Sequence, residues 1–407
     1  MRLASSSLFA ICAALVACGS GSNDSTSGSA DEIVDVPQSS VKNQTISNCW
    51  LYATLGWAES LHVATGEPAL DVSESYLSYW NWFDKLVWDG APGQTAIDET
   101  GFFHQGMDLI MRFGVIMEGD FTPTRQSTAK AAMDASMRDG VLKTKEARMD
   151  KVLVRKELNK AWQLSDQVVA QMNAVFGEGY DRSLDQPTTV LPEGSIVKHA
   201  KSISAKVVNG AGQTRVATLA DAIGLRDWDN GWGKRKGEFA WNELDYPKDV
   251  NQRRAFQIRF QKALHAQQPV VISWMIDFAG MTGSKFERPP ASAGRQGGHV
   301  TVLEDYQIND VPGFGTLKAG VNETRADALD AALSPSAKIE FIRTKNSWGE
   351  MNGPTPEFNG YLDLYMPYLD GPAIRCEDPP AGSPPGAQRT CTNDHVPLWR
   401  VALPAGF

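Results

Sequence analysis

The fold of this chain is decided by the stretch VKNQTISNCWLYATL, residues 41–55. A glutamine, Gln44, is followed shortly by a lone cysteine, Cys49, and the residues after the cysteine have the apolar character of a helix opening. Ser47 or Asn48 is a suitable N-cap for this helix. A thiol at a helix N-terminus lies near the positive end of the helix dipole, which favours the nucleophilic thiolate. The stretch therefore predicts a helix from Cys49 onward with a reactive cysteine in its first turn.

Two later segments offer the partners that a nucleophilic cysteine needs, namely a base and a group that orients the base. Residues 297–303 (GGHVTVL) place His299 at the start of an apolar, β-rich run. Residues 343–349 (RTKNSWG) place Asn346 before a tryptophan and a glycine. The order glutamine, cysteine, histidine, asparagine along the chain is that of papain-like cysteine proteases.

At these three segments the sequence resembles the papain-like cysteine peptidases, and it is most similar to their bleomycin hydrolase and aminopeptidase C branch. CWLYA at 49–53 and SESYLSYW at 73–80 carry the likeness to that branch. The resemblance covers roughly 39–121 and 256–370. Two departures are that Ile46 stands where papain has a second cysteine, and that the spacing from glutamine to cysteine is one residue shorter than usual in the family.

The resemblance implies acyl transfer by Cys49, with His299 as its ion-pair and acid–base partner and Asn346 orienting the imidazole. It also implies that the Cys49 N–H and the Gln44 amide stabilise the oxyanion, an effect worth about 3–4 kcal/mol per donor in comparable sites. Trp348 is expected to shield the His–Asn hydrogen bond from water. We expect no cofactor or metal, because no glycine-rich phosphate loop stands out and the other histidines lack ligand spacing.

The expected fold class is α+β, a two-lobed papain-like fold with Cys49 on a helical lobe and the histidine and asparagine on a β-rich lobe. The separation of Cys49 from His299, 250 residues, exceeds the roughly 130–150 of papain-type enzymes, so a large and mostly helical insertion is expected. This insertion is either structural cover or a wall that restricts the substrate. The expected segments are 39–121 for the helical lobe, 122–255 for the insertion, 256–370 for the β-rich lobe and 371–407 for a C-terminal tail.

Periodicity of apolar residues locates the main elements. The pattern predicts helices from 49 to about 65, over 72–88, over 101–113, at several places in 129–176, and over 256–265. It predicts strands at 270–274, 299–306, 339–345 and 360–365.

The N-terminus has the pattern of an export signal over residues 1–18. LVAC at 15–18, followed by Gly19, resembles a bacterial lipobox, which implies that Cys18 is lipidated; an ordinary signal peptide is the alternative. Residues 19–38 are dominated by small and polar residues and predict a flexible tether. We therefore expect an exported protein, lipid-anchored to a bacterial membrane and facing the periplasm or cell surface, with Gly19 favouring the outer membrane.

Cysteine usage and charge limit the remaining possibilities. Cys376 and Cys391 flank a loop rich in proline and glycine, and in an exported protein they predict a disulfide, with two free thiols as the alternative. The net charge of −9 and the lack of a basic run give no reason to expect nucleic acid. The expected partners are a peptide or protein substrate and a membrane, through the lipid anchor.

Three functional hypotheses remain open. The first is a papain-like cysteine peptidase anchored outside the cytoplasm, cutting proteins internally or trimming peptides. The second is a catalytically inactive scaffold of the same fold that acts as a surface binding protein. The third, a transglutaminase-like acyl transferase, is disfavoured because such enzymes usually have an aspartate where Asn346 stands.

Overall fold

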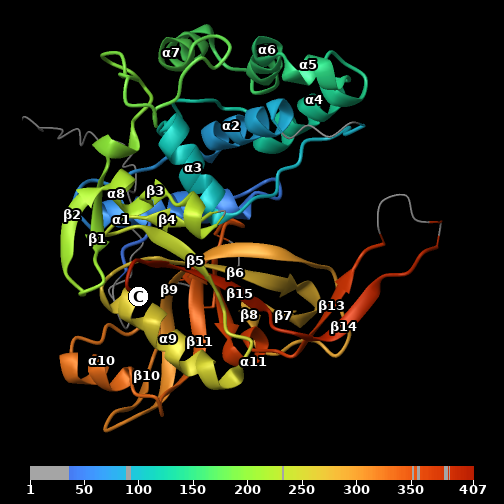
Figure 1. Ribbon diagram of the computed structural model, residues 1–407. Coiled ribbons are helices and arrows are strands. Elements are labelled where there is room, and N and C mark those ends of the chain that lie inside the picture. The colour runs from blue at the N-terminus through green and yellow to red at the C-terminus, as the bar shows by residue number, and fades with distance from the viewer. Residues whose placement is uncertain are drawn as a thin grey trace, which may run out of the picture.

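The computed structural model describes residues 36–88, 93–231, 233–350, 353–354, 358–379, 384 and 386–407. The expected signal peptide, Cys18 and most of the expected tether fall outside these described residues. Helices gather in one half of the molecule and a large sheet forms the other half (Figure 1). The expected α+β class is therefore confirmed.

Three helices from the first part of the chain form one packed group. They are α1 (Cys49–Val63), α2 (Glu74–Val87) and α3 (Phe103–Phe113). α1 lies between this group and the sheet. The ring centroid of Trp57 is 5.2 Å from that of Phe103 on one side and 5.5 Å from that of Trp241 of the sheet on the other. These helices begin and end within two residues of the predicted positions.

Four further helices pack onto the same core. They are α4 (Gln126–Arg138), α5 (Lys145–Met149), α6 (Lys151–Ala161) and α7 (Asp166–Phe176), and Figure 1 shows them beside α2. Trp80 of α2 stacks on Phe113 at 4.1 Å and meets Phe176 of α7 at 4.8 Å. The predicted insertion is therefore helical in its first half and shares the hydrophobic core of the helical half.

A run of short elements leads from the helices to the sheet. It comprises η1 (Ala200–Ser202), β1 (Ser204–Val208), β2 (Thr214–Thr218), α8 (Leu219–Ile223), β3 (Leu225–Arg226), η2 (Trp228–Asn230) and β4 (Arg235–Lys236). β1 and β2 form an antiparallel hairpin, and so do β3 and β4.

Within the described residues, nine strands form the main sheet. Its order is β5 (Trp241–Asp245), β15 (Leu398–Pro404), β6 (Val270–Asp277), β9 (Gln296–Val311), β11 (Lys338–Lys345), β12 (Tyr361–Tyr365), β8 (Lys285–Phe286) and β7 (Met281–Thr282), with β10 (Gly315–Leu317) beside β9. The sheet, α9 (Val250–His265) and α11 (Met366–Leu369) enclose a second hydrophobic core. The remaining short helices here are η3 (Phe278–Gly280) and α10 (Ala326–Ala332).

Two segment boundaries differ from the sequence-based expectation. β5 belongs to the sheet although its residues fall in the expected insertion, 122–255. β15 lies between β5 and β6, so the expected tail, 371–407, supplies an internal strand of the sheet, next to its edge. Other described residues of that tail form a hairpin of β13 (Ala373–Glu377) and β14 (Thr390–His395), which projects from the sheet in Figure 1. Among the described residues, no helix is both long and apolar enough to cross a membrane.

Candidate active site

Cys49 is the first residue of α1, as the sequence predicts. The expected side-chain cap is absent, because the Asn48 side chain makes no capping bond. Its amide nitrogen instead donates to Ser78 Oγ of α2 at 3.1 Å and to Gln126 Oε1 of α4 at 2.7 Å. The loop before the thiol is therefore held by hydrogen bonds to two neighbouring helices.

The thiol of Cys49 is unpaired and buried, with 9% of the residue exposed. Burial raises its pKa, and backbone N–H groups of Val300, Trp50 and Cys49 itself oppose the rise. Val300 directly follows His299 in β9. The sulfur therefore lies against the strand that carries His299.

His299 and Asn346 are joined by a hydrogen bond of 2.8 Å between Nε2 and Oδ1. Adjacent strands position the two residues, since β9 carries His299, and Asn346 directly follows β11, whose Lys345 pairs with Val302 of β9. An amide oxygen only accepts, so Nε2 carries the proton in this bond. In a neutral imidazole this leaves Nδ1 as an acceptor for a proton.

Aromatic rings enclose this pair. Trp348 stacks on the His299 ring with 5.0 Å between ring centroids, and Phe278 stacks on Trp348 with 5.8 Å between centroids. The Trp274 ring meets His299 edge-on, with 5.5 Å between centroids. Only 4% of His299 and 5% of Asn346 are exposed. Excluding water strengthens the hydrogen bond between them, which is the shielding expected of Trp348.

Burial lowers the pKa of His299 to about 4, although the bond to Asn346 works in the opposite direction. Since burial also raises the pKa of Cys49, both shifts favour the uncharged thiol and the uncharged imidazole. This differs from the thiolate–imidazolium pair that the sequence suggested. The physical reason is desolvation, which disfavours the charged form of each group.

Gln44 lies beside the segment that carries Asn346. Its backbone N–H donates to the Ser347 carbonyl at 2.8 Å, and Asn43 forms a bridge with Trp348. Its side-chain nitrogen donates to the Ile46 carbonyl at 2.9 Å, and its oxygen accepts from the Ser347 hydroxyl. One of the two amide hydrogens is therefore engaged within the loop.

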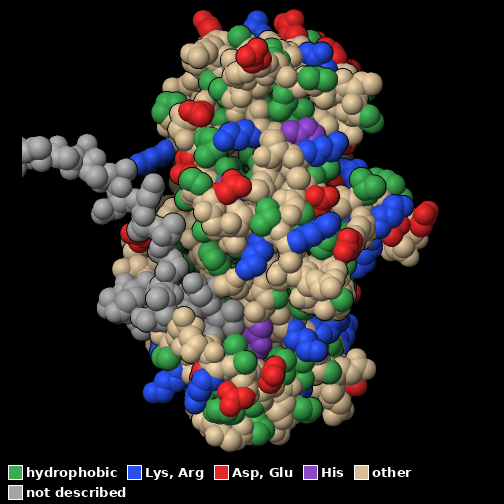
Figure 2. Space-filling view, turned by 90° about the vertical axis from the view of Figure 1, so that its left-hand side faces the viewer, with side chains coloured by type: hydrophobic (Ala, Val, Ile, Leu, Met, Phe, Trp, Pro, Cys, Tyr) green, Lys and Arg blue, Asp and Glu red, His purple; other side chains and the backbone are tan. Residues whose placement is uncertain are grey.

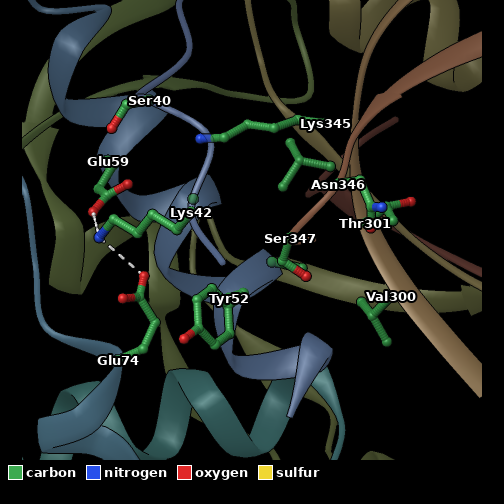
Figure 3. Close-up of a pocket in the computed structure, with 13 residues that line it drawn as sticks. Ser40, Lys42, Tyr52, Glu59, Glu74, Val300, Thr301, Lys345, Asn346 and Ser347 are labelled. Atoms are coloured by element: carbon green, nitrogen blue, oxygen red, sulfur yellow. Dashed lines mark hydrogen bonds and ion pairs between the residues drawn. The ribbon is translucent and has the colours of Figure 1, made fainter. Parts of the chain in front are cut away.

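A buried ion cluster lies behind the site, which sequence reasoning missed. Lys42 contacts Glu59 of α1 at 2.9 Å and Glu74 of α2 at 3.0 Å (Figure 3). It also contacts the exposed Asp71 at 2.8 Å. Burial opposes the charge on Lys42, but these carboxylates raise its pKa well above the ordinary value. Burial also raises the pKa of Glu74 to about 8, against the effect of Lys42. A signal was present in the sequence, because Glu59 interrupts the apolar helix that follows Cys49.

Lys345 extends the cluster to the sheet. Its ammonium donates to Ser39 Oγ at 2.6 Å, and Ser39 donates to Glu59. Figure 3 shows Lys345 reaching from the strand next to Asn346 toward the Lys42 side of the pocket. Burial lowers the pKa of Lys345 to about 8. The cluster therefore connects the helix of the thiol to the strand that leads to Asn346.

Cys376 and Cys391 form a disulfide between β13 and β14, the pairing that the sequence predicts. Among the described residues, no group of three or more His, Cys, Asp or Glu side chains is arranged to hold a metal ion. The chemistry available at the site comes from a thiol that lies against Val300 and from the imidazole of the preceding residue, His299.

No family model matches the chain, and no curated protein sequence matches it. Solved structures similar to it include xylellain, a cysteine protease from Xylella fastidiosa, at 11% identity and a TM-score of 0.35, over 91% of this chain and 85% of that one. PepW from Lactobacillus rhamnosis is 13% identical with a TM-score of 0.43, and the match covers 91% of this chain and 81% of PepW. The bromelain protease from Ananas comosus is 9% identical with a TM-score of 0.33, and the match covers 90% of this chain and 94% of bromelain.

Proposed function

We propose that the chain is a papain-like cysteine peptidase that cleaves peptide bonds through Cys49, His299 and Asn346. The observation that carries the proposal is the enclosed hydrogen bond from His299 Nε2 to Asn346 Oδ1, with the Cys49 thiol against the adjoining Val300 at the N-terminus of α1. A thiol, a base and a group that orients the base are the parts that acyl transfer needs.

The proposed reaction starts from the uncharged pair. Nδ1 of His299 takes the thiol proton as the sulfur attacks the substrate carbonyl, and the imidazolium then protonates the leaving amine. Asn346 holds the ring in the tautomer that leaves Nδ1 unprotonated. Water then attacks the acyl-enzyme, with His299 again as the base, and releases the carboxylic acid.

The oxyanion is proposed to bind the Cys49 N–H at the start of α1 and the second amide hydrogen of Gln44. The helix N-terminus favours the negative charge. Each donor of this kind is worth about 3–4 kcal/mol in comparable sites.

The inactive binding scaffold is the second candidate. The raised pKa of Cys49 and the hydrogen bond of the Gln44 amide to Ile46 favour it. Incubation with an unfolded protein such as reduced, alkylated casein separates the two, with Cys49→Ala as the control. Fragments that appear with the natural chain and not with the variant support the peptidase, and an unchanged casein supports the scaffold.

We also propose that the chain is exported and lipid-anchored through Cys18, with a peptide or protein as its partner and no nucleic acid. The lipobox-like residues 15–18 support the anchor. Basic and acidic side chains are intermixed over the face shown in Figure 2, as suits a protein that does not bind a polyanion there. Cys18→Ala is expected to move the protein from the membrane fraction to the soluble fraction of the producing cells, whereas retention in the membrane would contradict the anchor.

A further inference from the structure

The disulfide of Cys376 and Cys391 joins the two strands of a hairpin that forms a small sheet of its own. Among the described strands, β13 and β14 pair only with each other, and Cys376 lies opposite Cys391. Ala373 is the only buried residue of these two strands. Because an isolated two-stranded hairpin is marginally stable in water, we expect the bond between the two sulfurs to hold the strands together.

The hairpin is tied to the strand of His299 through Gln296, which lies three residues before the base in β9. The side-chain nitrogen of Gln296 donates to the Ile374 carbonyl at 2.6 Å. The side-chain oxygen of Gln296 accepts from the Cys376 N–H at 2.9 Å. Since Ile374 and Cys376 both belong to β13, these two bonds require that strand to keep its place.

Gln296 also contacts the residues that cover the base. Its side-chain nitrogen donates to Asp277 at 2.7 Å. Asp277 is buried and directly precedes Phe278. The Phe278 ring stacks on Trp348, which stacks in turn on the ring of His299. A displacement of Gln296 would therefore disturb the aromatic cover of the base as well as the start of its strand.

The sulfur atoms of the chain differ in their access to reagents. Cys391 is exposed and Cys376 is partly exposed, and exposed disulfides are the ones that thiols open most readily. The Cys49 thiol is buried, and burial raises its pKa, so little of it is present as the reactive thiolate. Among the described cysteines, redox chemistry is therefore expected first at the hairpin and not at the nucleophile.

We propose that the disulfide of Cys376 and Cys391 is a redox-sensitive site that controls the peptidase. A dithiol that opens this disulfide releases β13 from Gln296 and so lowers the activity that depends on the base. This inference rests on the proposed peptidase function and names a means of regulation for the same site.

The proposed exchange consumes one dithiol for each disulfide. A thiolate of the dithiol attacks the exposed Cys391 sulfur, which forms a mixed disulfide and breaks the bond to Cys376. The Cys376 sulfur leaves as a thiolate and takes up a proton. The second thiol of the reagent loses its proton and attacks the sulfur of the reagent in the mixed disulfide, which releases Cys391 as a thiolate that is then protonated. Two electrons and two protons have then passed from the dithiol, now a disulfide, to the protein.

Opening the hairpin is expected to admit water to His299. Burial lowers the pKa of this imidazole to about 4, and contact with water would let the pKa rise toward the ordinary value of about 6.5. The imidazole would then become protonated, and unable to take the thiol proton, at a higher pH than in the closed form. The pH below which Cys49 stops reacting should therefore move upward.

The experiment incubates the natural chain in buffers with a graded ratio of reduced to oxidised dithiothreitol. Mass spectrometry after alkylation in denaturant reports the opened fraction of the disulfide, and cleavage of reduced, alkylated casein reports activity in the same samples. The double variant Cys376→Ala/Cys391→Ala has no disulfide, whereas Gln296→Ala keeps the disulfide and lacks the link. Gln213→Ala, at an exposed turn, is the matched control for Gln296→Ala.

Activity is expected to fall about 3- to 10-fold as the disulfide opens, which is the size of effect that one hydrogen bond gives. It should reach the level of the double variant, which should not respond to dithiothreitol. Gln296→Ala should have this low activity in every buffer, and Gln213→Ala should behave as the natural chain does. In the double variant and in Gln296→Ala, without dithiothreitol, the pH at which iodoacetamide labelling of Cys49 declines should rise by about one unit or more.

Full activity with the disulfide completely open would overturn the proposal, and so would a disulfide that dithiothreitol does not open in the folded chain. A fall in activity that accompanies loss of the circular dichroism signal would overturn it as well, because the disulfide would then only stabilise the fold. Should the double variant not fold, the reduced natural chain and Gln296→Ala decide. If the oxidised natural chain cleaves no more casein than Cys49→Ala, the peptidase proposal fails, and the shift in labelling pH still tests the hairpin by itself.

Discussion

The two halves of the molecule hold their parts of the candidate site by different means. His299 and Asn346 are set by neighbouring strands, β9 and β11, whose backbone hydrogen bonds fix their separation. Cys49 stands at a helix end, and the loop before it is held by side-chain hydrogen bonds of Asn48 to two other helices. Geometry on the sheet side therefore depends on the backbone, whereas geometry on the helix side depends on individual side chains.

This contrast predicts which substitutions change only the rate of catalysis and which also change the stability of the fold. A side chain on the sheet side can be removed with little displacement of its neighbours, so its loss is expected to change the rate of catalysis alone. A side chain of the helix side or of the ion cluster also supports the position of the thiol, so its loss is expected to lower both stability and activity.

The largest effect is expected for His299→Ala. Loss of the base should lower kcat/KM on casein-derived peptides by about 10²- to 10⁴-fold, the usual contribution of a general base. The matched control is His265→Ala. Burial lowers the pKa of His265 to about 4, as it does for His299, but His265 bonds to Tyr306 on α9's side of the sheet. An equal loss of activity in both variants would mean that stability, and not base catalysis, is being measured.

The next largest effect is expected for Lys42→Met, which removes the cation that contacts both of the buried carboxylates Glu59 and Glu74. Breaking a buried ion pair in this way costs about 3–5 kcal/mol, to be measured as the free energy of unfolding in urea. Lys338→Met is the control, because Lys338 and its partner Asp310 are largely exposed and such pairs contribute about 0–1 kcal/mol. Similar losses of unfolding free energy in the two variants would contradict the conclusion that the ion cluster stabilises the fold.

Asn346→Ala tests the sheet side alone. The lost hydrogen bond engages a group that becomes charged during the reaction, a class worth about 1.5–3 kcal/mol. We expect kcat/KM to fall about 10- to 150-fold with little change in the melting temperature. A variant with full activity would show that the imidazole does not need this partner.

The smallest effect is expected for Gln126→Ala, which removes the acceptor for Asn48 in α4. One hydrogen bond of this kind contributes about 0.5–1.5 kcal/mol, and the loosened loop should slow iodoacetamide labelling of Cys49 only a few-fold. Gln213→Ala, at an exposed turn, is the control. Unchanged stability and labelling in Gln126→Ala would mean that the backbone alone fixes the thiol.

The sequence predicted the parts of this molecule that follow local rules. Helix periodicity located α1, α2 and α3, and the motif around Asn346 located the partner that contacts His299. The place of β15 inside the sheet could not be predicted, because pairing between strands 120 or more residues apart leaves no local pattern.

Polar contacts between residues far apart in the sequence could not be predicted either. The bond between Asn48 and Gln126 joins residues 78 positions apart, and Lys42 and Lys345 meet the same carboxylate cluster from opposite ends of the chain. The shifted pKa of His299 was missed for the same reason, because it follows from burial by aromatic rings that only the folded chain brings together.

The most direct test of the account is the rate of Cys49 alkylation by iodoacetamide between pH 4 and pH 9. The imidazole of His299 stays uncharged, and able to accept the thiol proton, until the pH falls to its pKa of about 4. The account therefore predicts labelling that persists well below pH 7, declines toward pH 4, and is lost in His299→Ala but not in His265→Ala. Labelling that rises only above the ordinary thiol pKa of about 8.5, and that ignores His299, would contradict the thiol–imidazole site and leave the binding scaffold as the function.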